Sequence, residues 1–342
     1  MNVALDATYS LGDHLSGVGV YSRELLYGLA GAHPEARFSF CYRSHRFLRS
    51  FRRPLPANAH RFLLTETRVP QKADIFHCLN QRVPKQTPPR TICTFHDLFV
   101  LTGDYSTPEF RARFAEQARQ AADRSDRIIA VSEFTATQVH ELLRVPRERI
   151  RVIHHGVRIP ARRAETREKI VLHVGAIQRR KNIVRLVEAF EKLDSDWVLV
   201  LAGGAGYGSQ EILARIGASP HRDRIRILGY VSDAELERWY ARAMVFAFPS
   251  LDEGFGMPVL DAMAAGVPVV TSRSSALPEV AGDAAWLVDP NNSGEIADAL
   301  QQLTRDPEKR AAMGRRGLLR ISQFSWRKAV EETWQVYGEL AG

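Results

Sequence analysis

The densest group of residues suited to chemistry lies in PSLDEGFGMPVLDAMAAGVPVV, residues 249–270. A turn in this segment contains Glu253, Gly254 and Gly256. Helical spacing of apolar residues begins directly after the turn, near Met257. Unpaired backbone amides at a helix start attract anions, and glycines let a phosphate approach the backbone closely. The segment therefore predicts a diphosphate site at this helix start.

The carboxylate of Glu253 needs a separate explanation, because it would lie beside the predicted anion and repel it. One function that fits is accepting hydrogen bonds from the hydroxyls of a sugar. The alternative is that Glu253 caps the helix and that the glycines only form the turn. Both interpretations stay open on this segment alone.

A second group of candidate residues lies in VGAIQRRKN, residues 174–182, directly after a predicted strand. Arg179, Arg180 and Lys181 are suited to phosphate oxygens, which guanidinium and ammonium groups bind through charged hydrogen bonds. Basic residues near helix starts are common on surfaces. The motif gains weight because both segments would meet at the same edge of a parallel sheet.

A third candidate is His96 in TFHDLF, at the end of a predicted strand in the N-terminal half. A histidine beside an aspartate is often structural or a metal ligand. The other histidines show neither HExxH nor cysteine-paired spacing, which argues against a metal site.

Together these motifs resemble the retaining GT-B glycosyltransferases of family 4, and the resemblance covers essentially the whole chain. The donor signature of that family is a Glu, seven residues and a second Glu, inside EGFGxPxxEAMAxGxPV. Here the first acid is Glu253, and the second position holds Asp261, whose side chain is one carbon shorter. The resemblance implies that Glu253 binds the donor sugar and that Asp261 holds the ribose diol.

The resemblance implies further binding residues. The basic stretch of the family corresponds to Arg180 and Lys181, which would neutralise the leaving diphosphate. Its glycine-rich loop matches SGVGVYSREL, where Gly17 and Gly19 would admit donor phosphate or acceptor, although Val20 replaces a frequent basic residue.

The remaining positions come from the same resemblance. Tyr230 in LGYVS would lie at the nucleobase, although a tyrosine in such a run is more often a core residue. Gly254, Phe255 and Gly256 complete the expected donor-binding segment. His96 matches the active-site histidine of the family and would position the donor sugar.

The implied activity is hexose transfer with retention of configuration, with His96 and Glu253 as the predicted catalytic residues. Retaining hydrolases use a second carboxylate as nucleophile, and none is evident here, so attack on the same face as the departing phosphate is expected. The two cations and the helix amides would stabilise the leaving charge without a metal or a cofactor. The expected donor is a nucleotide-diphosphate sugar, GDP-mannose by preference and a UDP-sugar as the alternative. The expected acceptor is a hydroxyl of a glycan or lipid-linked sugar in bacterial cell-surface synthesis.

Alternating strands and helices are expected to position these groups. Strands are predicted at 3–5, 38–42, 75–78, 91–95, 128–131, 150–153, 170–175, 197–202, 225–228, 245–248 and 267–271. Helices are predicted at 19–29, 110–122, 134–143, 182–193, 210–216, 233–242 and 257–265. Such alternation is typical of α/β proteins, and with the resemblance it predicts two doubly wound Rossmann-like domains facing across a cleft.

A polar segment, residues 157–169, marks the expected domain boundary. The predicted acceptor-side domain is residues 1–160 and the predicted nucleotide-sugar domain is residues 161–325. The final helix, residues 326–342, carries large apolar side chains at helical spacing, and we expect it to pack back on the N-terminal domain.

The composition of the 342 residues fits a water-soluble protein with two cores. No apolar run approaches the ~20 residues of a membrane span, and the first residues resemble a strand, so a cytoplasmic protein is expected. The three cysteines are expected to be reduced and buried. They are Cys41, Cys78 and Cys93.

Positive charge is concentrated in the N-terminal half. The net charge is +8, and residues 37–72 contain nine basic side chains and one acid, Glu66. Within this stretch, residues 42–55 place Phe47 and Phe51 four apart among arginines, which suggests docking on an anionic membrane, the inner face of the cell membrane. The alternative is an arginine-rich surface helix whose two phenylalanines face the core.

Other functions fit the sequence less well. GVGVYS and GGAGYGS both lack the third glycine of a dinucleotide-binding GxGxxG motif. No lysine can be nominated for the pyridoxal cofactor of a phosphorylase, and no nucleic-acid motif surrounds the basic stretch. The remaining alternative is a GT-B protein that lost turnover and acts as a nucleotide-sugar-binding or partner protein, suggested by Asp261 and Val20.

Overall fold

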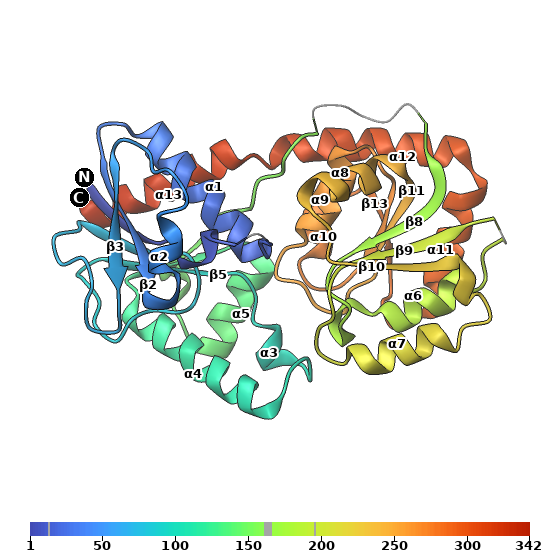
Figure 1. The fold of residues 1–342 in the computed structure, drawn as a ribbon, viewed down its shortest axis with the longest axis horizontal. Coiled ribbons are helices and arrows are strands. Elements are labelled where there is room, and N and C mark those ends of the chain that lie inside the picture. Colours follow the sequence, from blue (N-terminus) through green and yellow to red (C-terminus); the bar gives the residue numbers. More distant parts are fainter. Residues whose placement is uncertain (13, 161–165, 195) are drawn as a thin grey trace. The chain divides into compact units, whose positions relative to one another are not determined.

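The computed structural model describes residues 1–12, 14–160, 166–194 and 196–342. The chain divides into two compact units (Figure 1). Unit 1 contains Met1–Gly156 and Ser325–Gly342, and unit 2 contains Val157–Phe324. The division therefore lies four residues before the predicted boundary at residue 160, and residues 161–165 of the predicted boundary segment lie outside the described residues.

Unit 1 is built on a seven-stranded sheet in which every pair is parallel, in the order β3-β2-β1-β4-β5-β6-β7. The strands are β1 (Asn2–Asp6), β2 (Arg37–Arg43), β3 (Ala59–Leu64), β4 (Ile75–Cys78), β5 (Thr91–Phe95), β6 (Arg127–Ala130) and β7 (Ile150–Val152). Of the strands in this sheet, only β3 was not predicted from the sequence. This edge strand is half-buried and contains His60 and Arg61, so its apolar pattern is weak.

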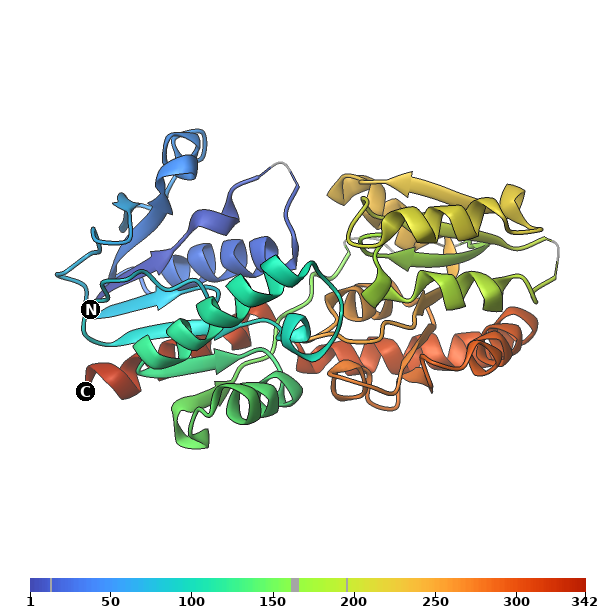
Figure 2. The ribbon, with the colours of Figure 1, turned by 90° about the horizontal axis from the view of Figure 1, so that it is seen from below.

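Side chains cap several of the helices of unit 1. The helices are α1 (Gly17–Ala32), α2 (Ser44–Ser50), α3 (Phe99–Thr102), α4 (Pro108–Arg124), α5 (Glu133–Leu143) and α13 (Trp326–Ala341). The hydroxyls of Ser16, Thr107 and Ser132 accept hydrogen bonds from first-turn amides of α1, α4 and α5. By contrast, α2 and α3 begin without a side-chain cap. Figure 2 shows helices on both faces of the sheet, as a doubly wound fold requires.

The last helix belongs to unit 1, the domain to which the sequence analysis assigned it. α13 packs along α1, and the two are side by side in Figure 1. Its Tyr337 hydroxyl bonds Nδ1 of the buried His77 at 2.7 Å, and Nε2 of His77 bonds Thr94 at 2.8 Å. Burial, followed by the charge of His96, lowers the pKa of His77 to about 3, so this imidazole stays neutral in the core.

Unit 2 contains a six-stranded parallel sheet in the order β10-β9-β8-β11-β12-β13. The strands are β8 (Glu168–Val174), β9 (Val198–Ala202), β10 (Ile225–Gly229), β11 (Ala243–Phe248), β12 (Val269–Ser272) and β13 (Ala285–Val288). In both sheets the chain starts a strand near the middle and adds strands to each side of it. The prediction of two doubly wound parallel sheets is therefore confirmed.

The helices of unit 2 are α6 (Ile183–Phe190), α7 (Ser209–Gly217), α8 (Asp233–Arg242), α9 (Met257–Ala264), α10 (Leu277–Ala281), α11 (Ser293–Arg305) and α12 (Pro307–Arg320). A capping box of Ser232 and Glu235 starts α8, whose bounds agree with the prediction. Four elements, α10, α11, α12 and β13, were not predicted from the sequence. β13 is only four residues long and half-buried along most of its length, so its pattern is weak.

The three cysteines are free and buried, as predicted. Burial raises the pKa of the Cys93 thiol to about 12 and also raises the pKa values of Cys41 and Cys78. All three are therefore protonated, apolar parts of the core at neutral pH.

Two glycines of α1 give a test of the packing of α13. A Cβ at Gly28 would lie 2.6 Å from Cγ2 of Val330, whereas a Cβ at Gly31 would meet nothing within 4 Å. We expect Gly28→Ala to lower the free energy of unfolding by about 1–3 kcal/mol, because Val330 is branched and cannot yield easily. Gly31→Ala should raise it by about 0.5–1 kcal/mol, because alanine favours helix. Urea denaturation measures both, and equal effects would contradict the packing described.

Candidate active site

The carboxyl edge of the unit 2 sheet brings two distant loops together. The loop after β8 supplies Arg180 and Lys181, and the loop after β11 supplies Glu253. Nη1 of Arg180 lies 2.6 Å from Oε2 of Glu253, and Nζ of Lys181 lies 2.5 Å from Oε1. Each of the three residues is less than a tenth exposed. The two predicted motifs therefore form one ion cluster.

The charges of this cluster decide its chemistry. Burial opposes ionisation of Glu253, but the charges of Arg180 and Lys181 outweigh it and lower the pKa of the carboxyl to about 2. Within this cluster, two cations and one anion leave a net charge of +1, which favours an anionic ligand. The alternative that Glu253 caps α9 is wrong, because the N-cap is Gly256 and no side chain caps this helix.

A residue absent from the predicted site holds the two loops together. Asn182 follows the cations in the left-handed conformation, with φ at 58°. Its Nδ2 donates to the carbonyls of Pro249 at 2.9 Å and Pro290 at 2.6 Å, and Leu251 N donates to the carbonyl of Arg180 at 2.8 Å. Asparagine tolerates this backbone conformation better than most residues, which is the signal that sequence reasoning could have used.

The turn that carries Glu253 is fixed from a third loop. The backbone amide of Glu253 donates a hydrogen bond to Oγ of Ser275 at 3.1 Å. Gly256 has φ at 115°, and a Cβ there would lie 2.7 Å from Leu277, so only glycine fits. The ring of Phe255 is buried against Phe324, so a donor would reach only the backbone of this predicted binding residue. Gly254 is also buried in this turn.

An aromatic residue of β11, itself stacked on a residue of β8, contacts Lys181. Its Nζ lies 4.6 Å from the centre of the Phe248 ring, a cation–π contact. Phe248 stacks on His173, whose Nδ1 donates to the carbonyl of Ala247 at 2.9 Å. Burial lowers the pKa of His173 to about 4, so this ring is neutral and adds no charge to the cluster.

Two further predicted residues lie in unit 2. Asp261 is half-buried on α9, and burial raises the pKa of its carboxyl to about 7, with Arg158 opposing and Asp233 adding to the rise. Tyr230 directly follows β10 and is 45% exposed, so its interpretation as a core residue is wrong. An exposed ring at this sheet edge fits the predicted contact with a base, which remains a prediction.

His96 lies in unit 1, directly after β5. It is 9% exposed, and its Nε2 donates to the carbonyl of Leu79 at 2.9 Å. Burial lowers the pKa of His96 to about 4, against the effect of this bond, so the imidazole is neutral at pH 7. Tyr21 meets it edge-on at 4.8 Å, and His155 stacks on it at 5.5 Å. A neutral imidazole held in this way can position a group but does not supply a cation.

The two predicted glycines of unit 1 differ in their surroundings. Gly17 is the exposed first residue of α1. Gly19 is buried, and a Cβ there would lie 2.9 Å from the carbonyl oxygen of Tyr9. The close packing of the preceding loop on α1 therefore explains Gly19 without a ligand.

Comparison with known proteins identifies the family. The family model described as glycosyl transferases group 1 matches residues 158–320, and that of glycosyltransferase family 4 matches residues 9–159. The O-antigen chain mannosyltransferase B of Escherichia coli is 32% identical over 313 residues, covering 85% of this chain and 81% of that protein. The chain belongs to glycosyltransferase family 4.

Other relatives and solved structures agree with this family. The D-inositol 3-phosphate glycosyltransferase of Mycolicibacterium smegmatis is 33% identical over 270 residues, 73% of this chain and 60% of that protein. Sucrose-phosphate synthase from Thermosynechococcus elongatus has a TM-score of 0.81 at 20% identity, covering 99% of this chain and 98% of that one. Anabaena HepE in complex with UDP and glucose has a TM-score of 0.73 at 18% identity, covering 98% and 99%. The fold of this family 4 glycosyltransferase is thus GT-B.

The buried cluster of this glycosyltransferase predicts a large loss of stability when its anion is removed. Glu253→Gln leaves Arg180 and Lys181 buried without a counter-charge, so the free energy of unfolding at pH 7 should fall by about 3–5 kcal/mol. The folded pKa lies below the ordinary value of 4.5, so the stabilisation is present above pH 4.5 and is lost as the pH falls towards 2. Urea denaturation from pH 7 to pH 3 should show the gap between wild type and variant narrowing.

Glu211→Gln is the matched control for this experiment. Glu211 pairs with Arg179 at 2.7 Å, but its side chain is 69% exposed. Such a pair contributes about 0–1 kcal/mol. Similar losses in the two variants would contradict a special role for the buried cluster.

Proposed function

We propose that this glycosyltransferase transfers a hexose from a nucleotide-diphosphate sugar to an acceptor hydroxyl with retention of configuration, in bacterial cell-surface glycan or glycolipid synthesis. The observation that carries the donor class is the buried cluster of Arg180, Lys181 and Glu253. It combines surplus positive charge for a diphosphate with a carboxylate suited to sugar hydroxyls. GDP-mannose is the preferred donor, supported by the relatives named as mannosyltransferases. A UDP-sugar is the alternative, supported by the HepE complex.

The predicted charged residues, Tyr230 and His96 have the following roles in this proposal. Arg180 and Lys181 neutralise the leaving diphosphate, and Glu253 accepts hydrogen bonds from the donor sugar. Asp261 holds the ribose diol, and the exposed Tyr230 lies at the base. The neutral His96 positions the sugar, and the departing phosphate takes the proton of the acceptor.

We also propose turnover without a divalent metal. Among the residues that the structure describes, no group of three or more His, Cys, Asp or Glu side chains is arranged to hold a metal ion. The support for the proposal is the surplus charge of Arg180 and Lys181, which can take the electrostatic role of a metal at the diphosphate. A protein that lost turnover is the less favoured alternative, because the predicted catalytic residues Glu253 and His96 are both present.

The experiment that tests this function is incubation with a panel of GDP-, UDP- and ADP-sugars and a mannoside acceptor, with excess chelator after desalting. We expect release of nucleoside diphosphate with one base, and a product whose anomeric configuration, read by NMR, equals that of the donor. Glu253→Gln should reduce turnover about ten- to a hundredfold, because a hydrogen bond to a charged acceptor is worth about 1.5–3 kcal/mol. Activity that appears only with magnesium or manganese would overturn metal independence, and no transfer with any donor would overturn the function.

Asp261 predicts a pH dependence of donor binding. Ribose hydroxyls donate to a carboxylate better than to a carboxylic acid, and the pKa of Asp261 is raised to about 7. We therefore expect the affinity for the nucleoside diphosphate to rise as the pH rises through 7. Asp261→Asn should bind more weakly at pH 8, and Asp261→Glu should bind at least as well as wild type.

Calorimetry from pH 6 to pH 8.5 measures this dependence. Titration of the ligand phosphate affects wild type and Asp261→Asn alike, so the difference between the two curves reports Asp261 alone. If Asp261→Asn binds as wild type does at pH 8, Asp261 is not the ribose ligand.

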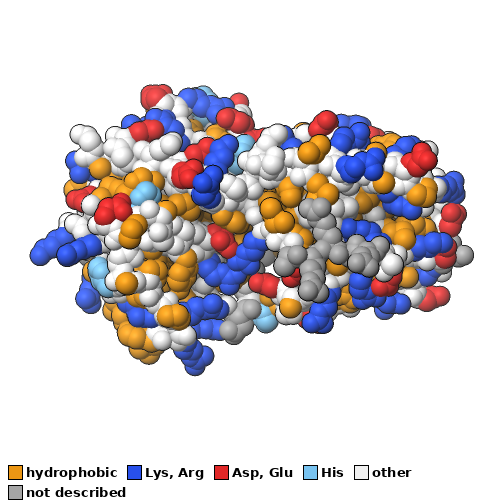
Figure 3. All heavy atoms as spheres, turned by 90° about the horizontal axis from the view of Figure 1, so that it is seen from above, with side chains coloured by type: hydrophobic (Ala, Val, Ile, Leu, Met, Phe, Trp, Pro, Cys, Tyr) orange, Lys and Arg blue, Asp and Glu red, His pale blue; other side chains and the backbone are white. Residues whose placement is uncertain are grey.

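A last part of the proposal concerns the cell membrane. Among the described helices, none is long and apolar enough to cross a bilayer. We propose that the protein is cytoplasmic and that residues 42–55 contact the anionic inner face of the membrane. On α2 and directly after it, Leu48 is 82% exposed and Phe51 is 61% exposed, whereas Phe47 packs against the core of unit 1. Basic and hydrophobic side chains also lie next to one another on the face of unit 1 in Figure 3.

Sedimentation with vesicles tests the membrane contact. Binding to anionic vesicles should exceed binding to neutral ones and should weaken with salt, since each basic residue near the surface contributes about 1 kcal/mol. Leu48→Ser should weaken binding, and Leu319→Ser, which changes a leucine of unit 2 that is 74% exposed, should not. Equal binding to both kinds of vesicle would reject the electrostatic contact.

A further inference from the structure

Unit 1 contains a hollow of about 320 Å³ that none of the donor-site roles uses, although its arginines belong to the segment 42–55 proposed to contact the membrane. Leu11 and Gly12 line one side, and the other is lined by Arg49 of α2 and by Arg52, Arg53 and Pro54 of the turn that follows it. Among the described residues of this lining, the charged ones are all arginines. A hollow of about 600 Å³ at the turn between α11 and α12 is instead lined by residues of both charges.

Arg52 and Arg53 carry the charge that is available to a ligand in this hollow. Within the described parts of the chain, the guanidinium groups of Arg52 and Arg53 form no hydrogen bond or ion pair. Glu66 is the one acid between residues 37 and 72. Its carboxylate pairs with Arg43 at 2.9 Å and accepts a hydrogen bond from the amide of Lys85 at 3.1 Å. Glu66 therefore does not neutralise the charges of Arg52 and Arg53.

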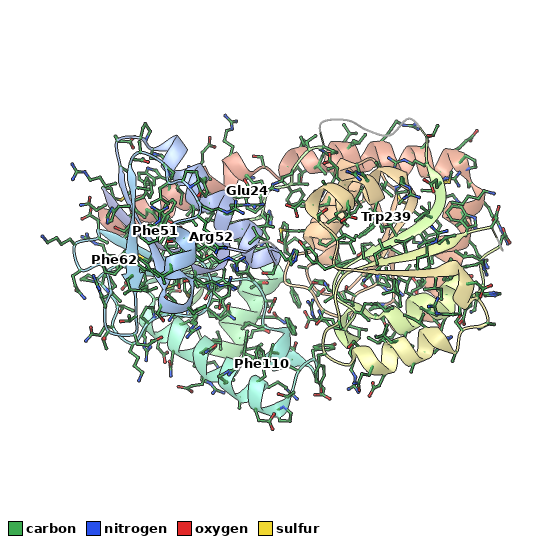
Figure 4. All side chains as sticks on the ribbon, in the orientation of Figure 1. Glu24, Phe51, Arg52, Phe62, Phe110 and Trp239 are labelled. Carbon is green, nitrogen blue, oxygen red and sulfur yellow. The ribbon has the colours of Figure 1, made fainter. Side chains whose placement is uncertain are left out.

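The turn that presents the arginines is well anchored. Nη2 of Arg61 donates to the carbonyls of Ser50 at 3.1 Å and Arg53 at 2.5 Å. The hydroxyl of Tyr27 donates to the carbonyl of Pro54 at 3.0 Å. Since these groups already satisfy the carbonyls at the end of α2, the side chains of Arg52 and Arg53 are not needed as caps. Figure 4 shows Arg52 and Phe51 on this part of unit 1.

The hollow lies at the functional edge of the unit 1 sheet. Leu11 and Gly12 follow β1, and α2 follows β2, so both walls come from the carboxyl ends of strands. His96 follows β5 at the same edge, because all strands of this sheet are parallel. Ligands of doubly wound sheets bind at this edge. A molecule that reaches His96 with one end can therefore extend along the edge towards the arginines.

We propose that this hollow binds the phosphoryl groups, a monophosphate or diphosphate, of a phosphorylated acceptor. The proposal rests on the proposed function and narrows its acceptor to this class. The planar forks of Arg52 and Arg53 match phosphate oxygens in bidentate geometry. Two uncompensated cations match a diphosphate better than a neutral sugar, and the volume is at the small end of the range for ligand sites.

The test compares two soluble acceptors with the full-length protein. One is an octyl mannoside, and the other carries a diphosphate between the same chain and the same sugar. The variant is Arg52→Gln with Arg53→Gln, which leaves the backbone carbonyl bonded by Arg61 in place. The matched control is Arg315→Gln with Arg316→Gln, an exposed adjacent pair on α12 in unit 2.

For wild type, the KM of the diphosphate acceptor should be at least tenfold lower than that of the neutral one, because charged hydrogen bonds are strong. The variant should raise the KM of the diphosphate acceptor at least tenfold while its kcat, the KM of the neutral acceptor and the donor affinity stay constant. The control pair should change none of these. Added inorganic pyrophosphate should compete with the diphosphate acceptor in the wild type more strongly than in the variant at saturating donor.

Equal KM values for the two acceptors, unaffected by the variant, would overturn this proposal while leaving the proposed function intact. A lack of transfer to both acceptors would instead overturn the proposed function. If the variant loses binding to anionic vesicles but keeps its KM for the soluble diphosphate acceptor, the arginines serve a lipid surface and the acceptor site is refuted.

Discussion

The buried ion cluster of Arg180, Lys181 and Glu253 is the interaction on which the donor side of the molecule depends. Two cations this close together in a buried position would repel each other and lose their hydration. Glu253 offsets both the repulsion and the lost hydration, because each of its carboxylate oxygens pairs with one cation at 2.5–2.6 Å. The two loops can therefore converge at the sheet edge only because their charges are complementary. Asn182 and Ser275 then fix the backbone around that pairing.

This arrangement merges a structural role with a chemical one. The carboxylate that keeps the cations together is the same group that is proposed to meet the donor sugar. A change at Glu253 therefore alters folding, the spacing of the cations and substrate contact together. Kinetic effects of such a change describe catalysis only when folding of the variant is measured beside them.

The sequence predicted most of the architecture because the buried strands are continuous apolar runs and α8 begins with a capping box. It missed β3 and β13, since partly exposed strands of mixed composition lack that pattern. It also treated Glu253 and the cations as separate motifs. Glu253 lies 72 residues after Lys181, and no periodicity shows that their side chains pair.

Individual side chains were predicted less completely for similar reasons. The exposure of Tyr230 and the packing of Gly19 depend on neighbours that are distant in sequence or lie in an irregular loop. The carbonyl contacts of Asn182 and the link between His77 and Tyr337 span 67 to 260 residues. The family resemblance identified positions near the ligand, whereas the residues that hold those positions in place came only from the structure.

The return of the chain from Phe324 to α13 has a consequence for synthesis on the ribosome. Unit 2 is a continuous segment, so all of its strands and helices are available once residue 324 has emerged. Unit 1 lacks α13 until the residues after 324 have also emerged, although its sheet is made first. Until then the side of α1 that meets Val330, and the ring of His77 that meets Tyr337, lack their partners. The domain translated first is therefore the last to be completed, the reverse of the usual order in multidomain chains.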